Sequence, residues 1–165
     1  MQSENTTYEV AIIGGGISGT ALLYSLSNYT NLNRIVLLEK NPEVALVNSH
    51  RTSNSQTLHF GDIETNYTLE KAQKVNKAAT LVKNYILRND PQQETYSKYH
   101  KMVLAIGKEE TLELRERYQE FKSLFPKLRL IEKEEIAALE PNVVKNRAPD
   151  EEILALFTEE GYTID

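Results

Sequence analysis

A glycine-rich turn between an apolar run and a helical pattern most restricts what this chain can fold into. A Val-Ala-Ile-Ile run is followed by the G-x-G-x-x-G glycines Gly14, Gly16 and Gly19. The first glycine permits a tight turn from strand to helix, the second has no Cβ to block a pyrophosphate, and the third lets the helix pack closely on the strand. The pattern therefore predicts a strand over 8–13 and a helix over 17–28.

A second apolar run, residues 34–38, is followed directly by an acidic residue. Glu39 lies twenty residues beyond Gly19. A carboxylate there can accept hydrogen bonds from both hydroxyls of an unphosphorylated adenosine ribose, while the helix N-terminus favours phosphate. The two runs therefore predict a βαβ unit that binds an ADP group, with Ser18 as a further contact. This motif alone does not distinguish FAD from NAD.

The segment after the second strand is long, polar and without a regular period over residues 40–66. Hydroxyl and amide side chains gather at Thr52, Ser53, Asn54 and Ser55 and continue to Thr57. Such groups suit a pyrophosphate, a ribityl chain and a flavin ring, which need many neutral hydrogen bonds. The alternative is a polar surface loop that leads into the next helix, with Thr68 as its N-cap.

His59 is the most chemically able side chain in this loop. An imidazole can remove the hydroxyl proton of an α-hydroxy acid while hydride leaves for a flavin. The alternative is a histidine that orients substrate or only hydrogen-bonds within the fold. Asp62 and Glu64 would repel an anionic substrate, so we expect them to face water or pair with a basic residue. No spacing of His, Asp and Glu predicts a metal site.

Beyond the loop, the apolar spacing predicts alternating helices and strands. A composition shift near residues 89–95 favours a domain boundary, with residues 1–90 in a cofactor-binding domain and 91–165 at the beginning of a substrate domain. Such a sheet needs further parallel strands, so the chain is expected to be the N-terminal part of a longer enzyme. The later elements are expected as helices over 69–89, 109–125 and 132–139, strands over 101–107, 128–131 and 153–157, and a turn at 159–161.

Composition excludes several classes of function. The 165 residues carry a net charge of −5, which argues against a nucleic-acid partner. The chain has no Cys, so it has no disulfide or thiolate chemistry, and this fits a reducing cytoplasm. The polar residues 1–7 do not resemble a signal peptide, and no apolar run is long enough to span a bilayer. Any membrane association is therefore expected to be peripheral.

Two motifs together resemble a known family. The glycine turn with Glu39, followed by residues 54–59, resembles the D-amino-acid-oxidase-like superfamily of FAD enzymes. The continuation Glu-Thr-Asn-Tyr-Thr over residues 64–68 is similar to the malate:quinone oxidoreductase family, as are residues 139–143 and 161–165. Gln56 departs from the family pattern, because relatives often have glycine there.

The resemblance implies a Rossmann-like α/β fold, in which an FAD-binding βαβ unit is followed by the start of an α+β substrate domain. It also implies that the chain is truncated relative to the whole family fold. It implies noncovalent FAD, oxidation of L-malate to oxaloacetate, electron transfer to a membrane quinone, and peripheral attachment to the cytoplasmic face of the cell membrane. The implied cofactor contacts are Gly14, Gly16, Gly19, Glu39 and the loop over 52–55.

Three alternatives remain open at this point. One is a related flavin-dependent 2-hydroxy-acid dehydrogenase, such as an L-2-hydroxyglutarate dehydrogenase. Another is a noncatalytic FAD-binding fragment. A third is a pyridine-nucleotide reductase module, although the long loop rich in Ser, Thr and Asn argues against it.

Overall fold

The computed structural model describes residues 7–164, so most of the polar N-terminal segment considered above lies outside the described residues. The chain divides into two compact units, residues 1–55 and residues 56–165. This division comes earlier in the chain than the boundary near residue 90 that composition favours. Each unit is described by itself, and the boundary near residue 90 stays a prediction about the domains of a longer enzyme.

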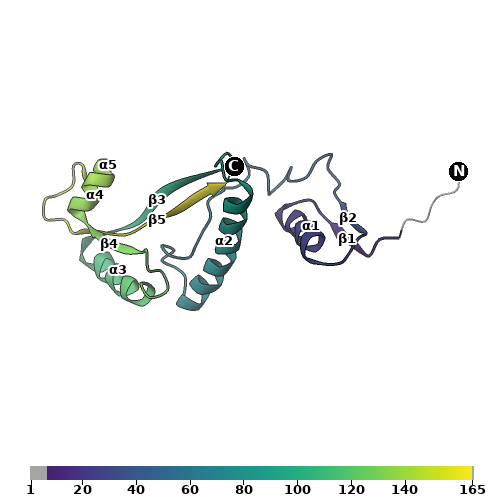
Figure 1. Ribbon diagram of the computed structural model, residues 1–165. Helices are drawn as coiled ribbons and strands as arrows, with labels where there is room; N and C mark the ends of the chain where they lie inside the picture. Colours follow the sequence, from purple (N-terminus) through teal and green to yellow (C-terminus); the bar gives the residue numbers. More distant parts are fainter. Residues whose placement is uncertain (1–6, 165) are drawn as a thin grey trace. The chain divides into compact units, whose positions relative to one another are not determined.

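The first unit is the βαβ unit that the glycine pattern predicts (Figure 1). Strand β1 (Val10–Ile13) leads into helix α1 (Ile17–Tyr29), and strand β2 (Ile35–Leu38) returns beside β1. The two strands are parallel along their whole length, from Val10 opposite Ile35 to Ile13 opposite Leu38. A right-handed crossover through a helix is the usual way to join parallel neighbours. The α/β assignment is confirmed.

The first unit leaves much of its apolar surface exposed. Ile13 is 87% exposed and Ile17 is 71% exposed, although both are large and apolar. Helix α1 has no fully buried residue. Two short strands and one helix are too small to bury both of their faces.

The second unit is built on an antiparallel sheet in the order β3-β5-β4. Its strands are β3 (Tyr96–Ile106), β4 (Arg129–Glu132) and β5 (Ile153–Ile164). The turn expected at 159–161 is wrong, because β5 continues as a strand through these residues, which lie at an irregularity in its pairing with β3. Tertiary pairing overrides the local turn signal here: the far half of β5 pairs with β3 as far as Tyr96 opposite Ile164, past a register shift between Tyr99 and Lys101.

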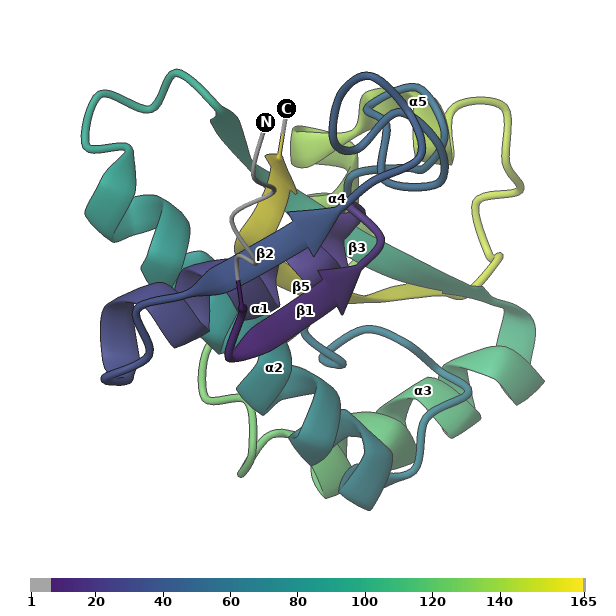
Figure 2. The same ribbon diagram turned by 90° about the vertical axis from the view of Figure 1, so that its right-hand side faces the viewer.

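Helices cover both faces of this sheet, as both ribbon views show (Figures 1 and 2). Helix α2 (Leu69–Asn89) and helix α3 (Gly107–Phe121) lie on one side, and helix α4 (Lys133–Leu139) and the short helix α5 (Pro141–Val144) lie on the other. Side chains of a strand alternate between faces. Leu154 and Leu156 accordingly pack toward α3, while Ala155 and Phe157 pack toward α4. Burial on both faces explains why this part of β5 is a continuous apolar run.

Helix α2 begins and ends where its sequence signals predict. The side chain of Thr68 accepts a hydrogen bond from the Lys71 backbone N–H, so Thr68 is the N-cap. The helix ends at Asn89, directly before Asp90-Pro91. Among the described residues, no helix is long and apolar enough to cross a membrane.

Candidate functional site

At two positions of the glycine turn, only glycine can adopt the observed geometry. Gly14 has a φ of +102°, which L side chains rarely adopt. A Cβ built on Gly19 would lie 1.9 Å from the carbonyl oxygen of Gly14, so no side chain can be accommodated there. The first and last glycines of the pattern therefore hold the β1–α1 turn closed, as the sequence predicts.

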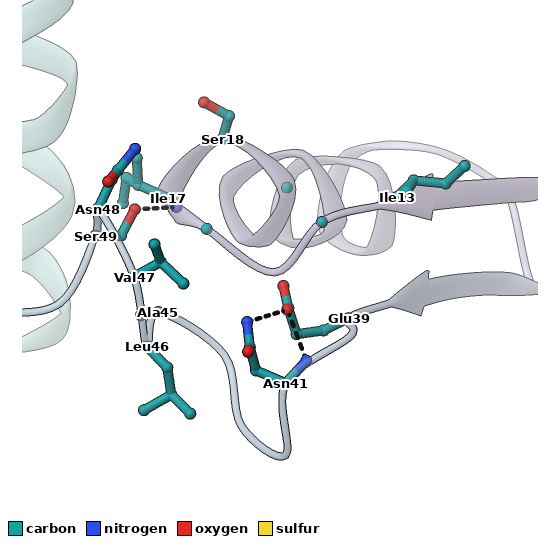
Figure 3. Close-up of a pocket in the computed structure, with 13 residues that line it drawn as sticks. Ile13, Ile17, Ser18, Glu39, Asn41, Ala45, Leu46, Val47, Asn48 and Ser49 are labelled. Carbon is teal, nitrogen blue, oxygen red and sulfur yellow. Dashed lines mark hydrogen bonds between the residues drawn. The ribbon is translucent and has the colours of Figure 1, made fainter.

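The carboxylate of Glu39 is bonded directly to this turn. One of its oxygens accepts a hydrogen bond from the Gly15 backbone N–H at 2.6 Å. The other accepts from the Asn41 backbone N–H at 2.9 Å and from the Asn41 side-chain amide at 2.7 Å, the pair drawn in Figure 3. Both oxygens are thus held, one by the glycine turn and the other by Asn41, and these contacts orient the carboxylate.

These hydrogen bonds also set the charge of Glu39. The Asn41 and Gly15 backbone N–H groups stabilise the ionised form and hold the pKa of Glu39 below its ordinary value. The residue is therefore an anion at neutral pH, as an acceptor of ribose hydroxyls requires. Asn41 belongs to no recognised sequence motif, and only its position two residues after Glu39 could have suggested this contact.

A cavity of about 360 Å³ lies over this turn within the first unit (Figure 3). Ser49 closes one side by accepting a hydrogen bond from the Ile17 backbone N–H at 2.9 Å. Ser18 lines the cavity, but its hydroxyl points away from Glu39 in this view. The residues that form the wall are Ile13, Gly14, Gly16, Ile17, Ser18, Gly19, Glu39, Asn41 and residues 45–49.

The four hydroxyl and amide residues of the loop do not line this cavity in the described part of the chain. Thr52, Ser53, Asn54 and Ser55 are exposed. Thr52 is hydrogen-bonded to His50 Nδ1 at 2.8 Å, and the Asn54 amide donates to the backbone carbonyl of His50 at 3.1 Å. The structure instead brings Ser49 to the helix start. A role for residues 52–55 in cofactor binding stays a prediction.

His59 belongs to the second unit, where its Nδ1 lies 2.9 Å from the Glu64 carboxylate. Its side chain is 57% exposed. Asp62 is buried against Lys101, with 2.7 Å between carboxylate and ammonium. Both acidic residues thus pair with basic ones, in agreement with expectation. Sequence reasoning missed Lys101, because its partner lies 39 positions away.

The first unit offers what an adenine dinucleotide needs. It has a helix N-terminus where Gly16 adds no side chain of its own and Ser49 accepts from the Ile17 N–H, an ionised carboxylate at the end of β2, and a cavity that both line. The residues present therefore fit the ADP end of FAD. Gly14, Gly16, Gly19 and Glu39 would hold it.

Comparisons with known proteins identify the family. Residues 9–165 match the model of the family described as FAD dependent oxidoreductase. The chain is 45% identical over 158 residues to a probable malate:quinone oxidoreductase of Campylobacter jejuni, which covers 93% of this chain and 35% of the relative. It is 34% identical over 137 residues to the mitochondrial L-2-hydroxyglutarate dehydrogenase of Dictyostelium discoideum, covering 81% of this chain and 29% of that protein.

Solved structures agree with this fold. The L-α-glycerophosphate oxidase of Mycoplasma pneumoniae, solved with FAD bound, superposes with a TM-score of 0.70 at 26% identity, over 97% of this chain and 39% of that one. The chain thus spans about a third of the length of the curated relatives it matches, 35% and 30% for two of them. The resemblance to malate:quinone oxidoreductases is confirmed, FAD is the cofactor of the matched family, and the chain belongs to the FAD dependent oxidoreductases.

Proposed function

We propose that this chain is the N-terminal part of an enzyme that oxidises L-malate to oxaloacetate and passes the electrons to a membrane quinone. The observation that carries the proposal is the 45% identity to the Campylobacter jejuni protein over 93% of the chain. Relatives from Helicobacter pylori named malate:quinone oxidoreductase, at 42% identity, support the same substrate and acceptor.

The first unit supplies the cofactor contacts in this proposal. Gly14, Gly16 and Gly19 leave the backbone open to the pyrophosphate, and Glu39 accepts a ribose hydroxyl. Ser18 and residues 52–55 are proposed as further contacts. Bound FAD supplies the acceptor for the two electrons and the hydrogen that leave malate as hydride.

His59 is the proposed general base. Its exposed imidazole can take the proton of the malate hydroxyl as the C2–H bond gives up hydride, so that the C2–O bond becomes a carbonyl. An anionic dicarboxylate also needs basic partners, and these are proposed to lie in the rest of the enzyme. Delivery of electrons to quinone requires contact with a membrane, proposed as peripheral and on the cytoplasmic face.

A panel of substrates tests this assignment in the full-length enzyme. Anaerobic mixing with L-malate should bleach the absorbance of the oxidised flavin, and L-2-hydroxyglutarate should do so far more slowly. Faster bleaching by L-2-hydroxyglutarate would transfer the assignment to the activity named for the Dictyostelium discoideum relative, which the 34% identity favours as the second candidate.

Separate measurements test the residues, the acceptor and the membrane. Glu39→Ala should lower the flavin retained after dialysis, and undiminished retention would remove Glu39 from the contacts. Malate-dependent reduction of a soluble quinone analogue, and sedimentation of the enzyme with vesicles, test the remaining parts. Quenching of FAD fluorescence by the 165-residue chain asks whether this part binds the cofactor alone.

A further inference from the structure

The segment that carries His59 is firmly attached on both sides of the imidazole. The Leu58 backbone N–H donates to the Tyr162 carbonyl at 2.9 Å, and the Ile164 N–H donates to the Gln56 carbonyl at 3.0 Å. Because β3 occupies one edge of β5, this pairing uses the other edge, past the end of β4. On the other side, Phe60 is 4% exposed within the core. An exposed histidine thus projects from a backbone that has little freedom.

The bond between His59 and Glu64 defines the tautomer of the imidazole. An ionised carboxylate only accepts hydrogen bonds, so its contact of 2.9 Å with the imidazole requires an N–H on Nδ1. In a neutral imidazole with a proton on Nδ1, Nε2 carries the free lone pair. In the neutral ring, this hydrogen bond therefore leaves Nε2 as the acceptor and directs Nδ1 toward Glu64.

Glu64 is itself held from a distant helix. Its side chain is only 15% exposed. Arg117, on α3, donates a hydrogen bond from its guanidinium to the Glu64 backbone carbonyl and stacks its Cζ 3.8 Å above the Phe121 ring. Burial lowers the pKa of Arg117, and the charges of Glu120 and Glu64 act in the opposite direction. The guanidinium of Arg117 is therefore close enough to Glu64 for the two charges to interact.

The Glu64 carboxylate contacts His59 through one of its two oxygens. The described hydrogen bond is made by Oε1, whereas Oε2, like Arg117 Nε, is buried without a partner within residues 7–164. The orientation of Glu64 is therefore set by its contact with the imidazole and by the hydrogen bond from Arg117 to its backbone.

We propose that Glu64 is a positioning residue that holds His59 with Nε2 free to accept the substrate proton. This inference rests on the proposed function, in which His59 is the general base. As the hydroxyl proton moves to Nε2, the imidazole becomes a cation, and the Glu64 carboxylate stabilises that cation through the Nδ1–H bond. Hydride leaves C2 for the flavin in the same oxidation, so protons and electrons balance. Arg117 fixes the backbone that carries Glu64.

Rapid-mixing measurement of malate-dependent flavin reduction in the full-length enzyme tests the inference. The variants are Glu64→Gln, His59→Ala and the double variant. Glu64→Gln keeps the shape and an acceptor oxygen but removes the charge, and it should slow reduction by roughly 10- to 100-fold with FAD retained. Because Glu64 acts through His59, the double variant should be no slower than His59→Ala. The control is Glu70→Gln, which changes an exposed glutamate that pairs with Lys74 on α2.

The outcomes separate the two levels of the argument. Wild-type reduction rates in Glu64→Gln, or multiplication of the two single effects in the double variant, would overturn the role of Glu64 while His59 remains the base. Unchanged reduction in His59→Ala would instead refute the base itself. If Glu64→Gln loses FAD, ring ¹⁵N chemical shifts of the wild-type enzyme decide, with the His59 signals assigned by their loss in His59→Ala. A neutral ring with its proton on Nδ1 supports the inference, and a neutral ring with its proton on Nε2 overturns it.

Discussion

The ammonium group of Lys101 lies 2.7 Å from the carboxylate of Asp62, and the two side chains are only 10% and 5% exposed. Lys101 comes from β3, whereas Asp62 belongs to the segment between His59 and α2. Lys101 also lies 5.5 Å from the centre of the Phe60 ring. This buried pair therefore fastens the candidate catalytic segment to the sheet.

Replacing Lys101 with Met should destabilise the second unit by about 3 kcal/mol, because it leaves the Asp62 carboxylate buried without its counter-charge. Urea unfolding followed by circular dichroism measures this loss. Lys74→Met, at an exposed position on α2, is the matched control and should change stability little. Adding Asp62→Asn to Lys101→Met should recover part of the loss, and a further loss would contradict the explanation.

The loss in Lys101→Met should depend on pH. Burial raises the pKa of Asp62 above its ordinary value of 3.8 even in the presence of Lys101, and removal of that cation should raise the pKa further. The native state then binds more protons than the unfolded state, so stability falls as the pH rises through this window. The variant should therefore approach wild-type stability as the pH is lowered. A constant difference from neutral to acidic pH would count against this origin.

The carboxylate of Glu160 joins α2 to β5 through Lys83 and also pairs with Lys127. Burial opposes its charge, but the two ammonium groups lower the pKa of Glu160 below its ordinary value of 4.5. The resulting stability is present above that value and is lost as the pH falls through the lowered pKa. Glu160→Gln should cost about 1–2 kcal/mol at neutral pH and less in acid. Its exposed neighbour provides the control, Glu159→Gln, which should have little effect.

Gln56 has a φ of 55°, in the left-handed region that favours glycine. Glycine, the residue that the family resemblance implies at this position, adopts such a φ without strain. Gln56→Gly should be neutral or stabilising by up to about 1 kcal/mol, since relief of strain competes with the greater entropy of an unfolded glycine. Gln73→Gly, inside α2, is the same change at a helical position and should destabilise by about 1 kcal/mol. Thermal unfolding of both variants tests the contrast.

Gly19→Ala should abolish retention of FAD by the full-length enzyme. The new Cβ would be placed 1.9 Å from the Gly14 carbonyl oxygen, so the turn must open. The ratio of flavin to protein after gel filtration measures the effect. Ser25→Ala, on the exposed side of α1, should retain the cofactor fully. Full flavin content in Gly19→Ala would show that the closed turn is not needed for binding.

Local sequence was enough to determine the first unit and the limits of α2. The β1–α1–β2 unit follows from apolar runs, a glycine spacing and a carboxylate that form one recognisable motif, although the contact between Gly15 and Glu39 joins residues 24 positions apart. The cap at Thr68 is local, because it depends on backbone conformation within a few residues.

Only the tertiary structure decided what surrounds the candidate site. The contact of Arg117 with Glu64 joins residues 53 positions apart, and the pairing of residues 56–58 with β5 joins opposite ends of the second unit. The same pairing network extends β5 through Glu159-Glu160-Gly161, where local residue types favour a turn. Long-range hydrogen bonds and burial outweigh local preferences of about 1 kcal/mol, and no short stretch of sequence contains both partners.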